Sequence, residues 1–366
     1  MKIYVAATRQ NDGKTTICLG LIAALQKRVR NVGYIKPVGQ RYIEINEHKV
    51  DEDALLIKEV YELKGSVTDM SPVAVPSGFT EAYIKNPDRE SIATAITQAY
   101  DRIAYGKDAV VIEGTGHAGV GSVFDMSNAD VVRLLDCKVL IVSSGGIGKP
   151  IDEVALNKAM FDQAGVEVIG VIVNKVLPEK YHKVSEMVRE GLARKGVELL
   201  GVIPYYQPLS NPTVEQLFDD IEGELLNGER QLRNVVSNMV IGAMPPHEAL
   251  DYIKEGTLLI TPGTREDLIL AAMSSSLVGK GTETMISGII LTGGKPPHPN
   301  VMALIERTPI PVILVQEDTF HLAQKVDHLI VKIRPTDYDK IRDSESLVEK
   351  HVNIDRIIEL VQTGHA

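Results

Sequence analysis

The first 28 residues join a short apolar strand, a polar turn and an apolar helix. Residues 2–7 are the strand, residues 8–12 are the turn, and Gly13-Lys14-Thr15-Thr16 opens the helical stretch. This order is typical of a phosphate-binding P-loop, because glycine lets the backbone approach an anion and the helix start directs N–H groups at it. The usual pattern has another glycine five residues before Gly13, where this chain has Thr8.

This loop provides the first candidate ligand contacts. Lys14 can reach the β- and γ-phosphates of a nucleotide, and the Thr15 hydroxyl can bind Mg²⁺. We expect the nucleotide-contacting residues of the loop to be Asp12, Gly13, Lys14, Thr15 and Thr16. An isolated Gly-Lys-Thr at a helix start is common by chance, but the strand before it and the helix after it favour nucleotide binding.

Composition narrows the class of protein. The chain has 366 residues, of which 44% are hydrophobic and 24% charged, as in ordinary globular proteins. The formal charge of −10 argues against nucleic-acid or anionic-membrane partners. No apolar run approaches membrane-spanning length, and the first strand breaks at Thr8-Arg9 instead of continuing as a signal peptide. Cys18 and Cys137 lie in apolar segments, so we expect a cytoplasmic protein with reduced cysteines.

Strand and helix patterns alternate over the first two hundred residues. The runs typical of strands are 3–7, 31–35, 109–112, 138–142, 168–173 and 199–203, and the helical stretches are 15–28, 53–61, 88–105, 151–164 and 181–195. Several of the strands are continuous β-branched runs, as in strands buried on both faces. The rhythm predicts an α/β fold of the P-loop NTPase type, a parallel sheet with helices on both faces.

A second α/β unit follows a proline-rich linker after Pro204. We expect domains at 1–207 and 208–366. The second domain is expected to contain a helix over 214–226, strands at 235–241, 257–260, 288–291 and 312–315, helices at 265–275, 300–307 and 319–326, and a helical C-terminal tail over 335–361. Thr213 and Gln216 form a candidate capping box before the first of these helices.

Four further polar residues of the first domain follow strands or begin helices. Lys36 ends the second strand, where it can reach an anion or remain a solvated charge. Asp53 can cap its helix or bind Mg²⁺ through water. Glu113 ends a buried strand before a glycine-rich loop, as suits a carboxylate that binds Mg²⁺ or orients a reactant, although a solvated turn residue fits too. Asn174 can recognise a purine edge or serve as a turn residue.

The ordered motifs resemble dethiobiotin synthetase and its relatives over about residues 1–207. They are residues 8–15, Lys36-Pro37-Val38, Asp53-Ala54-Leu55, Glu113-Gly114, Asn174-Lys175 and Gly201-Val202-Ile203-Pro204. The group includes cobyrinic acid a,c-diamide synthase and the amino-terminal segment of long bacterial phosphate acetyltransferases. The resemblance implies ATP and Mg²⁺ as cofactors. It implies catalytic roles for Lys14, Lys36 and Glu113, metal binding by Thr15, Asp53 and Glu113, and adenine recognition by Asn174.

Two segments depart from the synthetase pattern. Ala7-Thr8-Arg9-Gln10 replaces its Gly-Thr-x-Thr, and Gly39-Gln40-Arg41 replaces its Ala-Ser-Gly. Both line the diamino-acid site in that family, so we expect nucleotide binding without dethiobiotin synthesis. Lys-Pro followed closely by Gln resembles the phosphate acetyltransferase segment more. The chain also has no amidotransferase domain, and neither cysteine has the setting of a nucleophile.

The second domain resembles the DRTGG domain. The resemblance rests on residues 240–244, Leu259–Asp267, Leu291-Thr292-Gly293-Gly294, Pro309–Val312 and Glu317–Thr319. It implies a regulatory or assembly role, and we expect a homo-oligomer. Gly263-Thr264-Arg265 and Gly293-Gly294 are expected to form backbone N–H nests for a small anionic regulator, with tight turns as the alternative.

Two functional hypotheses remain. In the first, the chain is a Mg²⁺-dependent ATP-binding protein, an ATPase or ATP-dependent ligase-like enzyme with a regulatory domain. In the second, it is a non-catalytic nucleotide or metabolite sensor that controls a partner such as an enzyme of the acetyl phosphate pathway. Lys14, Thr15 and Glu113 favour turnover, whereas the altered substrate segments favour sensing.

Overall fold

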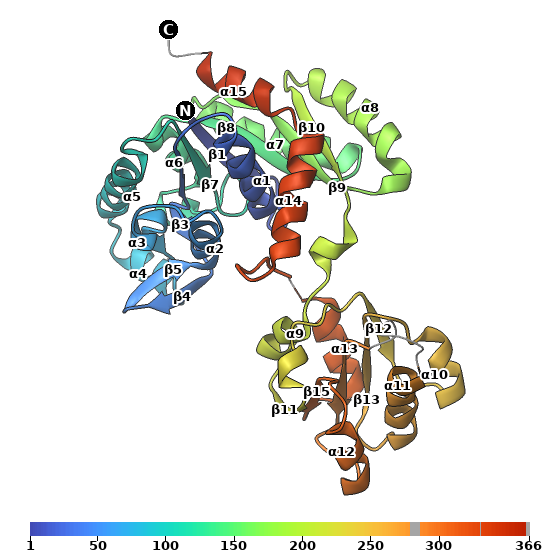
Figure 1. Cartoon of the computed structure of the whole chain (residues 1–366). Coiled ribbons are helices and arrows are strands. Elements are labelled where there is room, and N and C mark those ends of the chain that lie inside the picture. The colour runs from blue at the N-terminus through green and yellow to red at the C-terminus, as the bar shows by residue number, and fades with distance from the viewer. Residues whose placement is uncertain (279–285, 330, 364–366) are drawn as a thin grey trace. The chain divides into compact units, whose positions relative to one another are not determined.

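The computed structural model describes residues 1–278, 286–329 and 331–363. It divides the chain into two compact units (Figure 1). The first unit consists of Met1–Tyr206 together with the segment from Ile333 onward, and the second consists of Gln207–Lys332. The second unit is therefore an insertion in the sequence of the first.

A six-stranded parallel sheet forms the centre of the first unit, in the order β10-β9-β8-β1-β7-β2. Its strands are β1 (Lys2–Ala7), β2 (Val32–Ile35), β7 (Ala109–Glu113), β8 (Lys138–Ser144), β9 (Val168–Val176) and β10 (Leu199–Pro204). β1 lies between β7 and β8, and Ile3–Ala7 are at most 1% exposed. Its apolar run is long because both of its faces are covered, which is also the rule for the other central strands.

Helices flank this sheet and connect its strands. They are α1 (Lys14–Gln26), α2 (Glu52–Val60), α3 (Val67–Met70), α4 (Phe79–Lys85), α5 (Arg89–Ala104), α6 (Asn128–Leu135), α7 (Gly148–Gln163) and α8 (Tyr181–Ala193). The predicted α/β class and parallel sheet are confirmed. None of the helices in the described part of the chain is long and apolar enough to cross a membrane.

A small hairpin follows β2 that the sequence did not indicate. It pairs β4 (Tyr42–Ile45) with β5 (His48–Asp51) in antiparallel register, and Asn46 and Glu47 turn the chain with φ values of 49° and 66°. A short parallel pair joins β3 (Val38–Gly39), just before the hairpin, to β6 (Val73–Ala74), which follows α2 and α3. The hairpin matters for the site, because it ends at Asp51.

The C-terminal helices α14 (Tyr338–His351) and α15 (Ile354–Gln362) belong to the first unit. α14 packs along α1 (Figure 1), where Gly20 leaves space for the buried side chain of Val348. Val352 bridges Gly201 of β10 in antiparallel fashion. The sequence-based division, which ended the first domain at residue 207 and gave the tail to the second, therefore differs from the structure. The apolar stripe of the tail completes the core of the first unit.

The second unit has a five-stranded mixed sheet in the order β11-β15-β14-β13-β12. Its strands are β11 (Gly223–Asn227), β12 (Asn238–Ile241), β13 (Thr257–Pro262), β14 (Gly288–Thr292) and β15 (Val312–Val315), and only β11 is antiparallel to its neighbour. The helices are α9 (Val214–Asp220), α10 (Pro246–Tyr252), α11 (Glu266–Val278), α12 (Pro299–Ile305) and α13 (Thr319–Asp327).

The start of this unit corrects one expectation. The helix predicted over 214–226 ends at Asp220, and Gly223–Asn227 forms β11 against β15. Gly223 permits this pairing, since a Cβ there would lie 2.8 Å from Ile313 and 3.1 Å from the Leu314 carbonyl oxygen. Helical propensity of the Glu-Leu-Leu segment is overridden by the sheet partner.

Candidate functional site

The P-loop connects β1 to α1 at the carboxyl edge of the sheet. Gly13 has a φ of 97°, and a Cβ there would lie 2.2 Å from the Asn174 side-chain nitrogen, so glycine is required twice over. Asn11 also adopts a left-handed φ of 67°. Thr8, which replaces the usual first glycine, donates its hydroxyl to Asp12 over 2.8 Å. A threonine is accommodated there because the left-handed turns of the loop fall at other positions.

Two neighbouring strand ends hold this loop in place. Ser144, at the end of β8, donates its hydroxyl to the Asp12 carboxylate. Asn174, near the end of β9, donates its side-chain amide to the Asp12 carbonyl oxygen over 2.9 Å, and Lys175 donates to the Asn11 carbonyl oxygen over 2.8 Å. The Asp12 side chain thus organises the loop. Purine recognition by Asn174 stays a prediction, with one amide N–H already engaged by the loop.

Lys14 begins α1 and is 9% exposed. Its ammonium lies 3.4 Å from the Gly116 carbonyl oxygen, in the glycine-rich loop after β7. Burial lowers the pKa of Lys14, and the nearby charge of Glu113 opposes that shift. A buried ammonium with one long carbonyl contact is poorly compensated, so an anion in the loop would stabilise it.

Thr15 and Glu113 meet directly beneath the P-loop. The Thr15 hydroxyl donates to one carboxylate oxygen of Glu113 over 3.0 Å, and the Tyr34 hydroxyl donates to the other over 2.9 Å. Glu113 is 1% exposed, and this burial raises its pKa, with the Asp53 charge adding to the effect. Thr16 follows in the first turn of α1 and is half-buried. Tyr34 was missed by the sequence analysis because its strand reads as an ordinary apolar run.

Lys36 lies between two carboxylates just after β2. Its ammonium is 2.9 Å from an Asp51 oxygen and also pairs with Asp53. Burial opposes the charged form of Lys36, but Asp53 and Asp51 outweigh it and raise its pKa. Asp51, rather than Asp53, is the N-cap of α2, and it accepts a 2.9 Å hydrogen bond from the Asp53 backbone N–H. The capping alternative for Asp53 is therefore wrong; its neighbour two residues earlier has that role.

Asp51 is buried without full hydrogen bonding. It is 0% exposed, its second carboxylate oxygen has no hydrogen-bond partner among the described atoms, and burial raises its pKa. A Cβ at Gly39 would lie 2.6 Å from that oxygen. A side chain at residue 39 would therefore collide with Asp51. This contact explains why the chain has glycine directly after Lys36-Pro37-Val38, where the synthetase pattern has alanine.

The predicted charged residues form one electrostatic cluster. Beyond the effect of burial, the pKa of Lys14 is shifted by the nearby charges of Glu113, Lys36, Asp12 and Asp53. The pKa of Lys36 is likewise shifted by the charges of Asp53, Asp51 and Glu113. Two ammonium groups thus lie near four carboxylates, and burial raises the pKa of two of these, Asp51 and Glu113. A divalent cation would relieve this excess.

The donor set fits Mg²⁺ bound together with phosphate. In the described ranges, no group of three or more His, Cys, Asp or Glu side chains is arranged to hold a metal alone. Mg²⁺ commonly uses one or two carboxylates and completes its octahedron with water and substrate phosphates. Thr15, Glu113 and Asp53 match that requirement in residue type.

Asn128 is a second residue that sequence reasoning missed. Its side-chain oxygen accepts from the Tyr4 hydroxyl over 2.6 Å and from the Thr115 N–H over 3.0 Å, and its amide donates to the Thr115 and His117 carbonyl oxygens. It fixes the loop whose Gly116 carbonyl faces Lys14. Asn128 begins α6, and no sequence signal distinguishes it from an ordinary helix start.

The loops predicted to bind an anion in the second unit are occupied by their own backbone. The N–H groups of Gly263, Arg265, Gly293 and Gly294 donate to the carbonyl oxygens of Thr292, Pro262, Glu317 and Val315. The Arg265 guanidinium pairs with Asp267 over 2.9 Å. The alternative of tight turns describes these segments, since these four N–H groups are already engaged.

Comparisons with known families match both units. The AAA domain family AAA_26 matches residues 1–213, and the DRTGG domain family matches residues 216–329. The phosphate acetyltransferase of Nitratidesulfovibrio vulgaris is 28% identical over 368 residues, which cover 96% of this chain and 50% of that protein. The Synechocystis sp. phosphate acetyltransferase is 28% identical over 376 residues, which cover 99% and 52%. The chain spans about half the length of the curated relatives it matches.

Two solved structures show more distant likeness. The MinD cell division protein of Aquifex aeolicus is 17% identical, with 57% of this chain and 84% of that chain covered and a TM-score of 0.37. The CBS and DRTGG domains of the Clostridium perfringens pyrophosphatase regulatory region, complexed with diadenosine tetraphosphate, are 17% identical, with coverages of 48% and 85% and a TM-score of 0.27.

Proposed function

The chain belongs to the AAA domain family AAA_26 and continues into a DRTGG domain, and on that premise we propose that it binds ATP with Mg²⁺ in the first unit under regulation by the second. The observation that carries this proposal is the buried cluster under the P-loop. Lys14 stands at the helix start, and Thr15 contacts Glu113 within 3.0 Å. A phosphate in the loop would meet the α1 N-terminus and the Lys14 ammonium together.

The same cluster supports Mg²⁺ as the accompanying ion. Because the Thr15 hydroxyl donates its proton to Glu113, its oxygen lone pairs stay available for a metal. Thr15, Glu113 and Asp53 would hold the ion, which when bound would neutralise phosphate charge. Without the ion, the carboxylates that outnumber the lysines would repel the nucleotide, so affinity is expected to depend strongly on Mg²⁺.

If the chain catalyses a reaction, the chemistry is γ-phosphoryl transfer to a carboxylate or carbamate, or slow hydrolysis. Lys14 and Lys36 would neutralise charge on the transferred group, and Glu113 would orient the metal or a reactant. Dethiobiotin synthesis is not expected, since Gly39 faces the buried Asp51 and is followed by Gln40-Arg41.

A non-catalytic sensor is the second candidate, and one observation favours it. Lys36 is held by Asp51 and Asp53, so its charge is already balanced. Such a lysine would contact phosphate only after exchanging a carboxylate partner. In this hypothesis the nucleotide-bound chain controls a partner, for example an enzyme of the acetyl phosphate pathway.

A nucleotide panel separates the two candidates. ATP, ADP, GTP and CTP are titrated into the full chain with Mg²⁺ and with EDTA, and phosphate release is followed in parallel. Mg²⁺-dependent binding with release supports the enzyme, and binding without release supports the sensor. Absence of binding by every nucleotide would contradict both. Sedimentation velocity on the same samples tests the expected homo-oligomer.

A further inference from the structure

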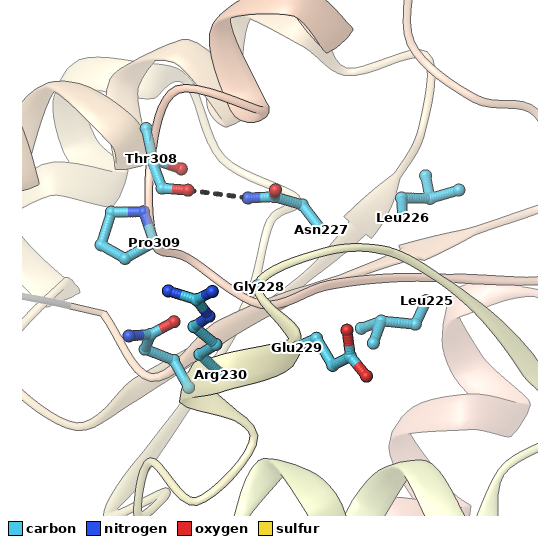
Figure 2. A pocket seen from close by; sticks show the side chains of 9 residues that line it. Leu225, Leu226, Asn227, Gly228, Glu229, Arg230, Thr308 and Pro309 are labelled. Carbon is cyan, nitrogen blue, oxygen red and sulfur yellow. Dashed lines mark hydrogen bonds between the residues drawn. The ribbon is translucent and has the colours of Figure 1, made fainter.

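The second unit contains a pocket that no sequence motif indicated. It has a volume of about 420 Å³, within the range of small-ligand sites. It lies where β11 ends and the loop between α12 and β15 passes (Figure 2). Leu225, Leu226 and Pro309 supply apolar surface, and the polar groups come from Asn227, Glu229, Arg230, Gln231 and Thr308.

The wall of this pocket is fixed by hydrogen bonds. The two N–H groups of the Asn227 side-chain amide are shared among three carbonyl oxygens of the facing loop, those of Ile305, Thr308 and Ile310, at 3.0, 2.9 and 2.9 Å from the nitrogen. Gly228 follows with a φ of 81°, and a Cβ there would lie 2.4 Å from the Pro311 backbone. The pocket is thus shaped by the fold before any ligand arrives, which reduces the entropic cost of binding.

Arg230 is the cationic group of this pocket; it is exposed to solvent, and Glu229 of the same lining carries a negative charge. The Arg230 guanidinium makes no hydrogen bond or ion pair with any residue in the part of the chain that the structure describes. Figure 2 shows its side chain extending toward Thr308 and Pro309, whereas the Glu229 carboxylate turns toward Leu225. A guanidinium can bind a carboxylate or phosphate through two parallel N–H donors, a geometry that a lone ammonium does not offer.

We propose that this pocket binds a small anion-bearing ligand, a carboxylate or phosphate attached to a short apolar group. Arg230 holds the anion, the Gln231 side chain adds a neutral polar contact, and Leu226 and Pro309 cover the apolar part, since the Glu229 carboxylate lies toward Leu225 (Figure 2). The proposal deepens the regulatory role proposed above for the second unit, and it moves the regulator away from the glycine loops, whose amides are engaged. Binding here does not require nucleotide in the P-loop.

The test uses the full chain and three probes. Inorganic phosphate and propionate each offer one anion type, and acetyl phosphate combines a phosphate with a short apolar group. Calorimetric affinities are compared for the wild type, Arg230→Ala and Arg233→Ala. Arg233 is a matched control because it is also an exposed arginine, lies three residues further on and is outside the pocket lining.

We expect at least one probe to bind the wild type and Arg233→Ala equally, with affinity lowered about tenfold or more in Arg230→Ala, as for the loss of a charge-assisted hydrogen bond. Preference for propionate or for the phosphates identifies the anion. The proposal would be overturned if Arg230→Ala bound the probes as well as the wild type does, or if Arg233→Ala lost as much affinity as Arg230→Ala. It would also be overturned if no probe bound at a concentration of about 10 mM. Each measurement is repeated in Lys14→Ala, where unchanged probe binding separates this pocket from the proposed nucleotide site.

Discussion

Substituting Gly20 tests whether the C-terminal tail packs on the P-loop helix. A Cβ added at Gly20 would lie 2.3, 2.4 and 2.9 Å from three side-chain carbons of Val348 on α14. The closest of these is the Val348 Cβ itself, which cannot rotate away, so the two helices must separate. Such overpacking costs about 1–3 kcal/mol, with this contact at the upper end. Alanine in a helix interior returns about 1 kcal/mol relative to glycine.

Gly20→Ala is therefore expected to lower the free energy of unfolding of the first unit by about 2 kcal/mol. The same substitution made in a Val348→Gly background should instead stabilise by about 1 kcal/mol, because the obstructing carbons are gone and only the helix preference remains. The change of sign corresponds to a coupling energy of about 3 kcal/mol, at the upper end for residues in contact. Urea unfolding followed by far-UV circular dichroism measures all four members of the cycle.

A control comes from another helical glycine. At Gly191 on α8, the nearest atom to an added Cβ is the Ile151 Cδ1 at 2.3 Å, the free end of a flexible side chain. Gly191→Ala should be close to neutral or stabilising by up to about 1 kcal/mol. If Gly20→Ala stabilises the wild-type chain as much as Gly191→Ala does, α14 does not pack on α1 and the insertion topology is wrong.

Two further substitutions address the buried cluster. Tyr34→Phe removes a hydrogen-bond donor to Glu113, so calorimetry should show nucleotide affinity about tenfold lower with Mg²⁺ and unchanged in EDTA. The control is Tyr61→Phe, which should leave both affinities unchanged because the Tyr61 hydroxyl donates to the Leu19 carbonyl oxygen. Equal effects of the two variants would count against the role of the Tyr34 hydroxyl. Lys36→Met leaves the buried carboxylates of Asp51 and Asp53 without their cation and should lower the free energy of unfolding by about 3–5 kcal/mol. Adding Asp53→Asn should restore part of this loss. A loss below about 1 kcal/mol in urea unfolding would show that the ion pairs of Lys36 are solvated.

Much of the first unit could be predicted from local sequence patterns. β-branched runs and apolar helices repeat along the chain, and each pattern reports its own burial. The P-loop was recognisable because its glycine, lysine and threonine are consecutive. Glu113 was recognisable because it ends an apolar strand, and the structure places it 3.0 Å from Thr15.

The sequence-based predictions that failed concern structure set by contacts between segments far apart in the chain. The tail reads as a polar helix with an apolar stripe, and nothing in it specifies that Val348 meets Gly20 more than three hundred residues earlier. Gly223–Asn227 reads as helix, but β15 provides a sheet partner. Tyr34 and Asp51 acquire meaning only through Glu113 and Lys36, which other strands bring beside them.

The central claim is that the P-loop binds a nucleotide through Lys14, and calorimetry tests it most directly. ATP with Mg²⁺ is titrated into the wild type and into Lys14→Ala under identical conditions. Loss of one charge-assisted phosphate contact is worth about 1.5–3 kcal/mol, so the variant should bind about 10- to 150-fold more weakly. Equal affinities for the two proteins, or no heat of binding for the wild type, would contradict the account.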